Sequence, residues 1–166
     1  WGPIEIPGLY FFSGVAIDHG RLFVINFDGE LRSFDAATGA PIWTTQLNGS
    51  NFFTAPPTAV NGVVYVGGSG TLSAVDETNG GILWTASVSG GDKSSPTVSE
   101  DGVFVSYACQ VYKFEPFSGN TLWHYAGGCS GGGGRTSVWS NGELFVRHTS
   151  ITPPNPIFDA GTGTIL

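Results

Sequence analysis

Charged side chains, and cations above all, are scarce in this sequence. Of its 166 residues only 11% are charged, and six lysines and arginines stand against thirteen acids, which leaves a net charge of −7. Nucleic acids and anionic membranes are bound by clustered cations, so the chain is predicted to bind neither. No run reaches the roughly 18 apolar residues of a membrane span, so membrane insertion is not expected. Methionine is absent even from the first position, which favours a processed or excised segment.

Motifs for catalysis and for cofactor binding are lacking as well. The sequence contains no Gly-x-Ser-x-Gly turn, and its glycine runs at 67–70 and 131–134 lack the Gly-Lys-Ser/Thr ending of a phosphate-binding loop. Its three histidines occupy different phases of the repeat described next, so we do not expect them to share a metal ion: His19, His124 and His148. The sequence therefore predicts no enzyme, no cofactor and no metal site.

What the chain does contain is one pattern repeated four times. A turn triplet recurs at intervals of 42, 40 and 40 residues, each time before an apolar run: Asp18-His19-Gly20, Val60-Asn61-Gly62, Glu100-Asp101-Gly102 and Ser140-Asn141-Gly142. Asn-Gly between apolar runs predicts a β-hairpin, and a period near forty residues is typical of propeller blades. We expect an all-β fold, a β-propeller of four-stranded antiparallel blades, within one domain at 1–166.

The repeats are placed at 7–48, 49–90, 91–128 and 129–166. In the second repeat the pattern predicts strands at 57–60, 63–66, 71–76 and 82–88, with a turn at 67–70. Each repeat also carries an acid that opens a glycine turn, and this acid is expected to accept backbone N–H bonds rather than bind a metal: Asp35, Asp76, Glu115 and Asp159. The second strands are unbroken apolar runs, which indicates sheets covered on both faces.

A tryptophan follows the acid by eight residues in three of the repeats, at Trp43, Trp84 and Trp123. The fourth would fall at position 167, whereas the chain ends at Leu166 and begins with Trp1. Residues 1–6 are therefore predicted to be the closing outer strand of a blade. This leaves three forms open: half of an eight-bladed ring, a small ring closed by the chain's own N-terminal strand, or an assembly in which that strand completes another copy.

The segment from Leu72 to Trp84 resembles the repeat of the PQQ-like β-propellers, Leu-x-Ala-x-Asp-x-x-Thr-Gly-x-x-x-Trp, and residues 31–43 match it nearly as well. This family includes quinone-dependent alcohol dehydrogenases and non-enzymatic scaffolds such as an outer-membrane assembly lipoprotein. The dehydrogenases share an adjacent Cys-Cys pair that this sequence lacks. The resemblance thus implies the non-enzymatic branch, without bound quinone, and it implies that four tryptophans dock one blade against the next: Trp1, Trp43, Trp84 and Trp123.

Two further features concern the compartment. In an antiparallel blade the second turn and the loop after the fourth strand emerge at the same end, and Cys109 and Cys129 occupy these segments of the third repeat. We expect a disulfide between them, with two free thiols as the alternative. A disulfide favours an extracellular, cell-surface or envelope location of a secreted protein. Asn48-Gly49-Ser50 fits the N-glycosylation pattern, which also arises by chance.

A binding face is predicted from the segments just before the innermost strands. Aromatic pairs stand there in the first two repeats, and basic residues come from loops at the same end of the blades: Tyr10, Phe11, Phe52, Phe53, Arg135, Arg147 and His148. They would form a platform for a carbohydrate, a peptide or a sister subunit. The alternative is that the rings fill the crowded inner edges of the blades.

These observations favour a non-catalytic extracellular structural or binding module that associates through propeller edges and loops. Strand donation between copies would give a homo-oligomer, or a filament if the contacts do not close. Two alternatives remain open. One is a protein-binding envelope assembly factor, and the other is a fragment of a quinone-dependent dehydrogenase completed by the remainder of a longer propeller.

Overall fold

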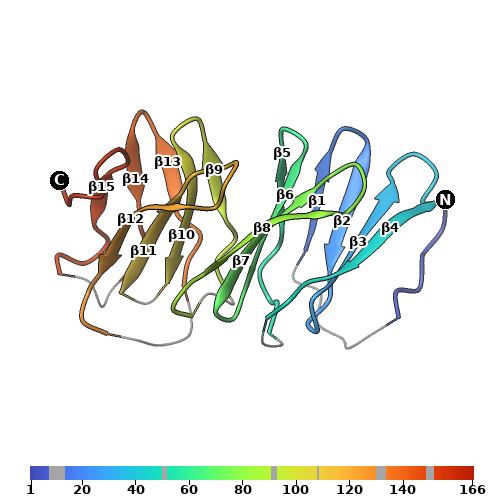
Figure 1. Ribbon diagram of the computed structural model, residues 1–166, viewed down its shortest axis with the longest axis horizontal. Coiled ribbons are helices and arrows are strands. Elements are labelled where there is room, and N and C mark those ends of the chain that lie inside the picture. Colours follow the sequence, from blue (N-terminus) through green and yellow to red (C-terminus); the bar gives the residue numbers. More distant parts are fainter. Residues whose placement is uncertain (8–13, 50–51, 91–92, 108, 130–133, 149–151) are drawn as a thin grey trace.

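The structure, a computed structural model, describes residues 1–7, 14–49, 52–90, 93–107, 109–129, 134–148 and 152–166. In these ranges every regular element is a β-strand, and the strands form four antiparallel sheets that lie side by side (Figure 1). None of the described segments forms a helix that is long and apolar enough to cross a membrane. The expected all-β propeller architecture is confirmed.

Each sheet is an antiparallel meander in chain order, and we call the four sheets blades 1 to 4. Blade 1 consists of β1 (Val15–Asp18), β2 (Arg21–Ile25), β3 (Glu30–Asp35) and β4 (Pro41–Gln46). Blade 2 consists of β5 (Thr58–Val60), β6 (Val63–Gly68), β7 (Thr71–Asp76) and β8 (Ile82–Ser87). Blade 3 consists of β9 (Thr97–Ser99), β10 (Gly102–Tyr107), β11 (Gln110–Phe114) and β12 (Thr121–Ala126). Blade 4 contains β13 (Val138–Ser140), β14 (Glu143–Phe145) and β15 (Ile157–Asp159), and a single bridge joins Phe158 to Ile165.

The hairpin between the first two strands follows the predicted turn chemistry in three blades. Its two central residues have positive φ, for example 54° at Asn61 and 80° at Gly62, as the tight two-residue turn requires. In blade 3 the register differs by one residue, because Ser99 pairs with Gly102 and the turn consists of Glu100 and Asp101. The triplet placed Gly102 in this turn, and that assignment was wrong.

The core lies between the blades rather than inside any one of them. Buried side chains from the second and third strands of adjacent blades form three clusters, one at each junction. At the first junction, for example, Phe23, Ile25 and Leu31 of blade 1 meet Val64 and Val66 of blade 2. Because each inner blade is covered on both faces, its second strand is apolar without a break.

The predicted turn at 67–70 is too long, since β6 continues as a strand through Gly68. The reason is the ring of Phe53, which is fully buried and packs directly over Gly68. A Cβ at Gly68 would lie 2.4 Å from Cε1 of Phe53, and one at Gly29 would lie 2.6 Å from Cε2. Both glycines therefore leave room for one aromatic ring between blades 1 and 2.

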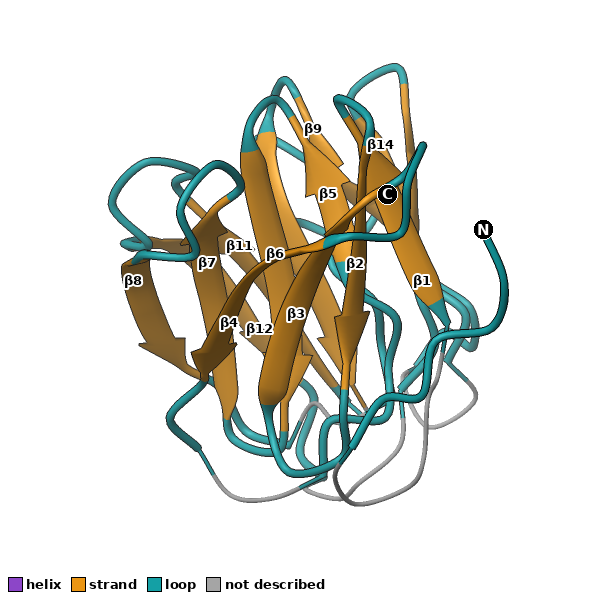
Figure 2. Ribbon diagram, turned by 90° about the vertical axis from the view of Figure 1, so that its right-hand side faces the viewer, coloured by secondary structure: helices purple, strands orange, loops and turns teal. Residues whose placement is uncertain are grey.

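The four blades form an open arc, with the N-terminus at the blade 1 end and the C-terminus at the blade 4 end (Figure 1). Residues 1–7 form no strand and run along blade 1, as the end-on view also shows (Figure 2). Of the three forms left open by the sequence, the small ring closed by the chain's own residues 1–6 is not the one seen here. The physical reason is that blade 1 and blade 4 lie at opposite ends of the arc, so residues 1–6 do not reach blade 4 of the same chain.

Candidate functional site

The tryptophans link consecutive blades through the turn after the third strand. The indole N–H of Trp43 donates to the backbone carbonyl of Glu77 at 2.9 Å, that of Trp84 to Pro116 at 2.8 Å, and that of Trp123 to Ala160 at 3.0 Å. Each ring also covers the glycine of that turn, where a Cβ would clash with it. Trp1 repeats this contact on blade 1, donating to the carbonyl of Ala36 at 3.1 Å and covering Gly39.

The acids that open these turns cap them. Oδ1 of Asp35 accepts hydrogen bonds from the backbone N–H of Ala37 at 3.0 Å and of Thr38 at 2.7 Å, and also from the Thr38 hydroxyl. These bonds, the one from the Thr38 hydroxyl first, hold the pKa of Asp35 below its ordinary value. Asp76, Glu115 and Asp159 cap their own turns in the same way. These four carboxylates have a structural role, as expected.

Cys109 and Cys129 form a disulfide, with their Cα atoms 5.5 Å apart. His148, which comes from the fourth blade, lies beside this bridge, and its Nε2 accepts a hydrogen bond from the backbone N–H of Cys109 at 3.2 Å. Burial lowers the pKa of His148. One predicted binding residue is therefore engaged in holding the disulfide loop against the next blade.

The structure removes one residue from the predicted aromatic face, and the binding role of the others stays a prediction. Phe53 was wrongly placed in it, because this ring is fully buried between two blades, which is the packing alternative. Phe52 is 51% exposed and lies edge-on against Phe27, with ring centroids 4.9 Å apart. Arg135 and Arg147 are exposed, while Tyr10 and Phe11 lie outside the described residues. Asn48 is exposed, and Ser50 of its triplet also falls outside the described ranges.

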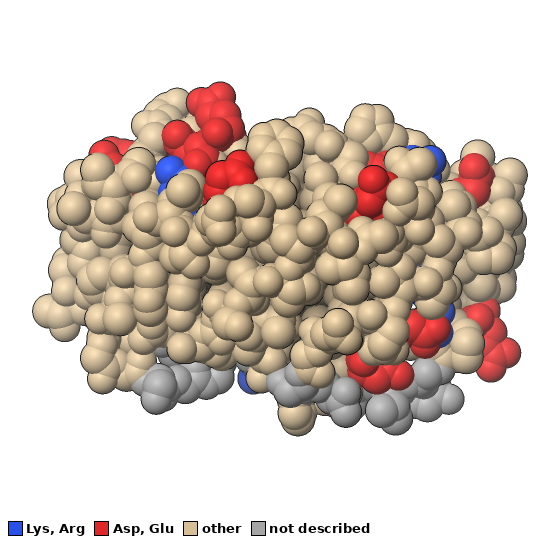
Figure 3. All heavy atoms as spheres, in the orientation of Figure 1, with Lys and Arg blue, Asp and Glu red and all other residues tan. Residues whose placement is uncertain are grey.

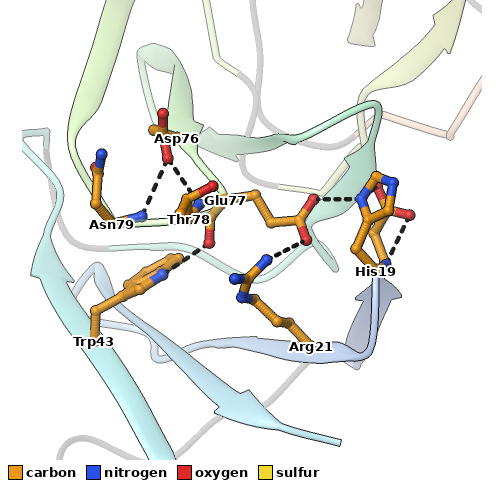
Figure 4. Close-up of polar contacts among 8 residues, drawn as sticks. His19, Arg21, Trp43, Asp76, Glu77, Thr78 and Asn79 are labelled. Carbon is orange, nitrogen blue, oxygen red and sulfur yellow. Dashed lines mark hydrogen bonds and ion pairs between the residues drawn. The ribbon is translucent and has the colours of Figure 1, made fainter.

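A polar cluster that the sequence did not predict lies where blade 1 meets blade 2 (Figure 4). Nδ1 of His19 is 3.2 Å from Oε2 of Glu77 and 3.2 Å from Oδ2 of Asp18. The other carboxylate oxygen of Glu77, Oε1, accepts a hydrogen bond from Arg21 at 3.2 Å. We call these four residues the junction cluster. Two acids, one guanidinium and one imidazole thus meet at a single point.

The backbone holds the junction cluster in place from both blades. Asp18 and His19 lie at the tight turn between β1 and β2, where His19 has a φ of 41° and its N–H donates to Oδ1 of Asp18. Glu77 follows β7, and its backbone carbonyl is the one that receives the Trp43 indole. Its side chain, 1% exposed, extends back toward blade 1. The contact that docks the blades therefore also aims this carboxylate.

The electrostatics of the junction cluster favour positive charge. The hydrogen bond to Glu77, followed by the charge of Asp18, holds the pKa of His19 above its ordinary value. Oδ2 of Asp18 is buried and forms no hydrogen bond. Asp18, His19 and Glu77 each offer one atom that could ligate a metal ion, and these three atoms all lie within 4.8 Å of one another, which is a spacing that one metal ion can bridge. The cluster is suited either to an ion-paired clamp between blades or to a cation.

Sequence reasoning missed this cluster because it treated His19 as a turn residue and did not consider Glu77 separately. Glu77 stands 58 positions from His19 in the chain, and the two meet only when blades stack. One signal was available. The position after the turn acid holds Ala36, Pro116 and Ala160 in the other repeats, so a glutamate there is the exception.

Four stacked blades joined by tryptophan-to-turn contacts define a β-propeller of the PQQ-like class. The model of one family within this class, described as outer membrane protein assembly factor BamB, matches residues 10–67 and 27–153. The chain belongs to this family.

Relatives of known name are similar over part of their length. Tetrathionate hydrolase of Acidithiobacillus ferrooxidans is 30% identical over 114 residues, which is 61% of this chain and 23% of that protein. BamB of Shewanella oneidensis is 28% identical over 123 residues, which is 66% of this chain and 31% of that protein. The chain thus corresponds to less than a third of each of these relatives.

Solved structures show the same fold at low identity. BamB from Moraxella catarrhalis superposes with a TM-score of 0.72 at 21% identity, over 93% of this chain and 51% of that one. The computationally designed protein Ika4 gives a TM-score of 0.70 at 16% identity, over 87% of this chain and 88% of that one. At these identities the likeness concerns the fold alone.

Proposed function

We propose that this chain is a non-catalytic, protein-binding module of the cell envelope or extracellular space that associates through the edges of its propeller. The observation that carries the proposal is the position of Trp1. It makes the contact with blade 1 that Trp43, Trp84 and Trp123 make with the blades that follow theirs. Residues 1–7 thus occupy the place of the outer strand of a blade that would precede blade 1.

Both ends of the arc expose apolar side chains. On blade 1, Val15 is 63% and Ile17 is 64% exposed, and on blade 4, Val138 is 61% and Phe145 is 39% exposed. Ala59, the residue of blade 2 that corresponds to Ile17, packs into the core of the first junction. Exposed apolar side chains grouped on one face of a blade favour an interaction site there. The two end faces are therefore suited to covering by further blades.

The N-terminal segment covers its end of the arc incompletely. Trp1 remains 64% exposed, whereas Trp84, which makes the same contact inside the arc, is 8% exposed. A hollow of about 250 Å³ lies between residues 4–7 and the outer part of blade 1, lined by Arg32, Phe34 and Thr44 among others. Packing of another blade against this face would fill the hollow and bury the indole.

The partner that fits this face is blade 4 of a second copy. In blade 4 the third strand pairs with the start of a fourth strand through a single bridge, from Phe158 to Ile165. Residues 1–7 of the other copy would continue this fourth strand by β-augmentation. Such head-to-tail contacts give a ring if they close and a filament if they do not. Further blades of the same polypeptide would make an equivalent contact.

The location and the protein-binding character rest on three supports. Some relatives of this chain are named as outer membrane protein assembly factors. The Cys109–Cys129 disulfide suits an oxidising compartment. Uncharged side chains dominate the face shown in Figure 3, with acids gathered toward the ends of the blades, and this favours protein rather than nucleic-acid partners.

The test is the solution mass of the chain over a wide concentration range, measured by light scattering coupled to size exclusion. We expect a dimer or larger species, and we expect Trp1→Ala to shift it toward monomer. Phe117→Ala is the matched control, because Phe117 is 90% exposed but lies on a turn of blade 3 away from both ends. A wild-type chain that is monomeric at every concentration would refute association between copies.

The quinone-dependent dehydrogenase alternative has less support. The quinohemoprotein alcohol dehydrogenases match at 17% and 19% identity, so they share the fold only. Added quinone and calcium are therefore expected to give no dye-linked alcohol oxidation by this chain.

A further inference from the structure

We propose that the junction cluster is a binding site for one divalent metal ion of the zinc type, held by Oδ2 of Asp18, Nδ1 of His19 and Oε2 of Glu77. The ion would join the first turn of blade 1 to the last turn of blade 2. This site is independent of the end faces on which association between copies depends.

The spacing of the donor atoms fits tetrahedral coordination. Nδ1 of His19 is 3.2 Å from each of the two carboxylate oxygens. Ligands bound to zinc at about 2.0–2.1 Å in a tetrahedron stand roughly 3.3–3.4 Å apart, so the two edges already match. The third edge, between the two carboxylate oxygens, is no longer than 4.8 Å. Coordination therefore needs only small side-chain movements.

Hydrogen bonding alone leaves the cluster unsatisfied. Nδ1 of His19 carries one hydrogen at most, so it cannot serve both carboxylates that approach it. It bonds to Glu77, and Oδ2 of Asp18 stays buried without a hydrogen bond. Its remaining contact is the ion pair with His19, and a buried carboxylate oxygen without a hydrogen bond is costly. A cation placed among the three donors would satisfy this oxygen and offset the repulsion between the two acids.

The surroundings orient the ligands and select the metal. Arg21 holds Oε1 of Glu77 and so leaves Oε2 directed at His19 (Figure 4). Glu77 is 1% exposed while His19 is 63% exposed, so the ion would be anchored from the inside and open to water on the outside. An imidazole with two carboxylates suits zinc and similar transition metals, whereas calcium and magnesium prefer oxygen ligands alone.

The other junctions lack these ligands, which fixes the stoichiometry. In place of His19 the turns of blades 2 and 4 carry Asn61 and Asn141, and in place of Glu77 the turns of blades 3 and 4 carry Pro116 and Ala160. Repetition of the fold therefore does not repeat the site. One bound ion per chain is expected.

The experiment is calorimetric titration of the chain, made without a polyhistidine tag, with zinc chloride, followed by the visible spectrum after addition of cobalt. We expect one ion per chain, intense cobalt bands typical of tetrahedral coordination, and a rise of several degrees in Tm at saturating zinc. His19→Asn removes the imidazole but suits the positive φ, as Asn61 shows at 54°. Its affinity for zinc is expected to fall at least 100-fold.

Two further variants test a second ligand and provide a control for the loss of a histidine. Glu77→Gln preserves the shape of the side chain and is expected to lose the cobalt bands. His124→Asn removes a histidine that stacks on Tyr112, away from the cluster, and should bind zinc as the wild type does. If the wild type binds no zinc, or if His19→Asn binds it equally well, the cluster is only an ion-paired clamp and the proposal is wrong. Because neither Trp1 nor the end faces take part, this result is separate from that of the association test.

Discussion

The ring of Phe53 offers the sharpest test of how blades 1 and 2 pack. A Cβ at Gly68 would lie 2.4 Å from Cε1 of this ring, against the 3.5–4.0 Å of an ordinary carbon contact. The ring has little room to move away, because its opposite edge packs so closely against Gly29 that a Cβ there would be only 2.6 Å from Cε2. Gly68→Ala is therefore expected to cost about 3 kcal/mol, the upper end of the range for overpacking.

A double-mutant cycle shows whether this clash is the cause. Phe53→Ala alone should cost about 3–5 kcal/mol through the cavity that it leaves. In that background the methyl group added by Gly68→Ala has no ring to clash with, so the cost of this substitution should vanish. The coupling energy between the two substitutions should then reach about 2–3 kcal/mol. If Phe53→Ala does not fold, Phe53→Leu serves as a milder background.

The assay is urea unfolding followed by tryptophan fluorescence, with the free energy of unfolding taken from the linear extrapolation. Gly2→Ala is the matched control, because a Cβ at Gly2 would have nothing within 4 Å, and it should change stability by less than about 0.5 kcal/mol. Equal costs of Gly68→Ala with and without the Phe53 ring would refute the reasoning.

Contacts within and between the blades make three further contributions to stability that can be measured. Reduction of the Cys109–Cys129 disulfide, which closes a loop over a separation of 20 residues, should lower the free energy of unfolding by about 3 kcal/mol, measured in urea with and without reductant. Trp84→Phe keeps a ring but loses the bond to Pro116, so it should cost about 1–2 kcal/mol in the same assay, and no loss would show that the bond is immaterial. Three of the turn acids, Asp35, Glu115 and Asp159, have pKa values below their ordinary ones in the folded chain, so their stabilisation is complete above the ordinary pKa and is lost as pH falls through the folded pKa. A variant with these three acids replaced by amides should lose less stability than the wild type in urea unfolding as the pH falls below about 5.

Much of the fold could be predicted because its main determinants are local in sequence. The turn after each third strand is specified by an acid and a glycine within five positions, and the first hairpin of three blades by two residues of positive φ. Two errors arose where the neighbouring blade decided the outcome. Gly68 resembled a turn residue but lies in a strand, because the Phe53 ring arrives from another repeat. Phe53 resembled a surface aromatic for the same reason.

The junction cluster escaped prediction for a related reason, which also explains how such a site can arise. Every blade is docked through a backbone carbonyl of the turn, and the side chain of that residue has no part in the bond from the indole. Alanine, glutamate, proline and alanine all serve, at Ala36, Glu77, Pro116 and Ala160. The fold therefore fixes the position and direction of this residue without restricting its chemistry. At Glu77 that freedom places a buried carboxylate beside the turn of the preceding blade, where one histidine is enough to complete three converging donors.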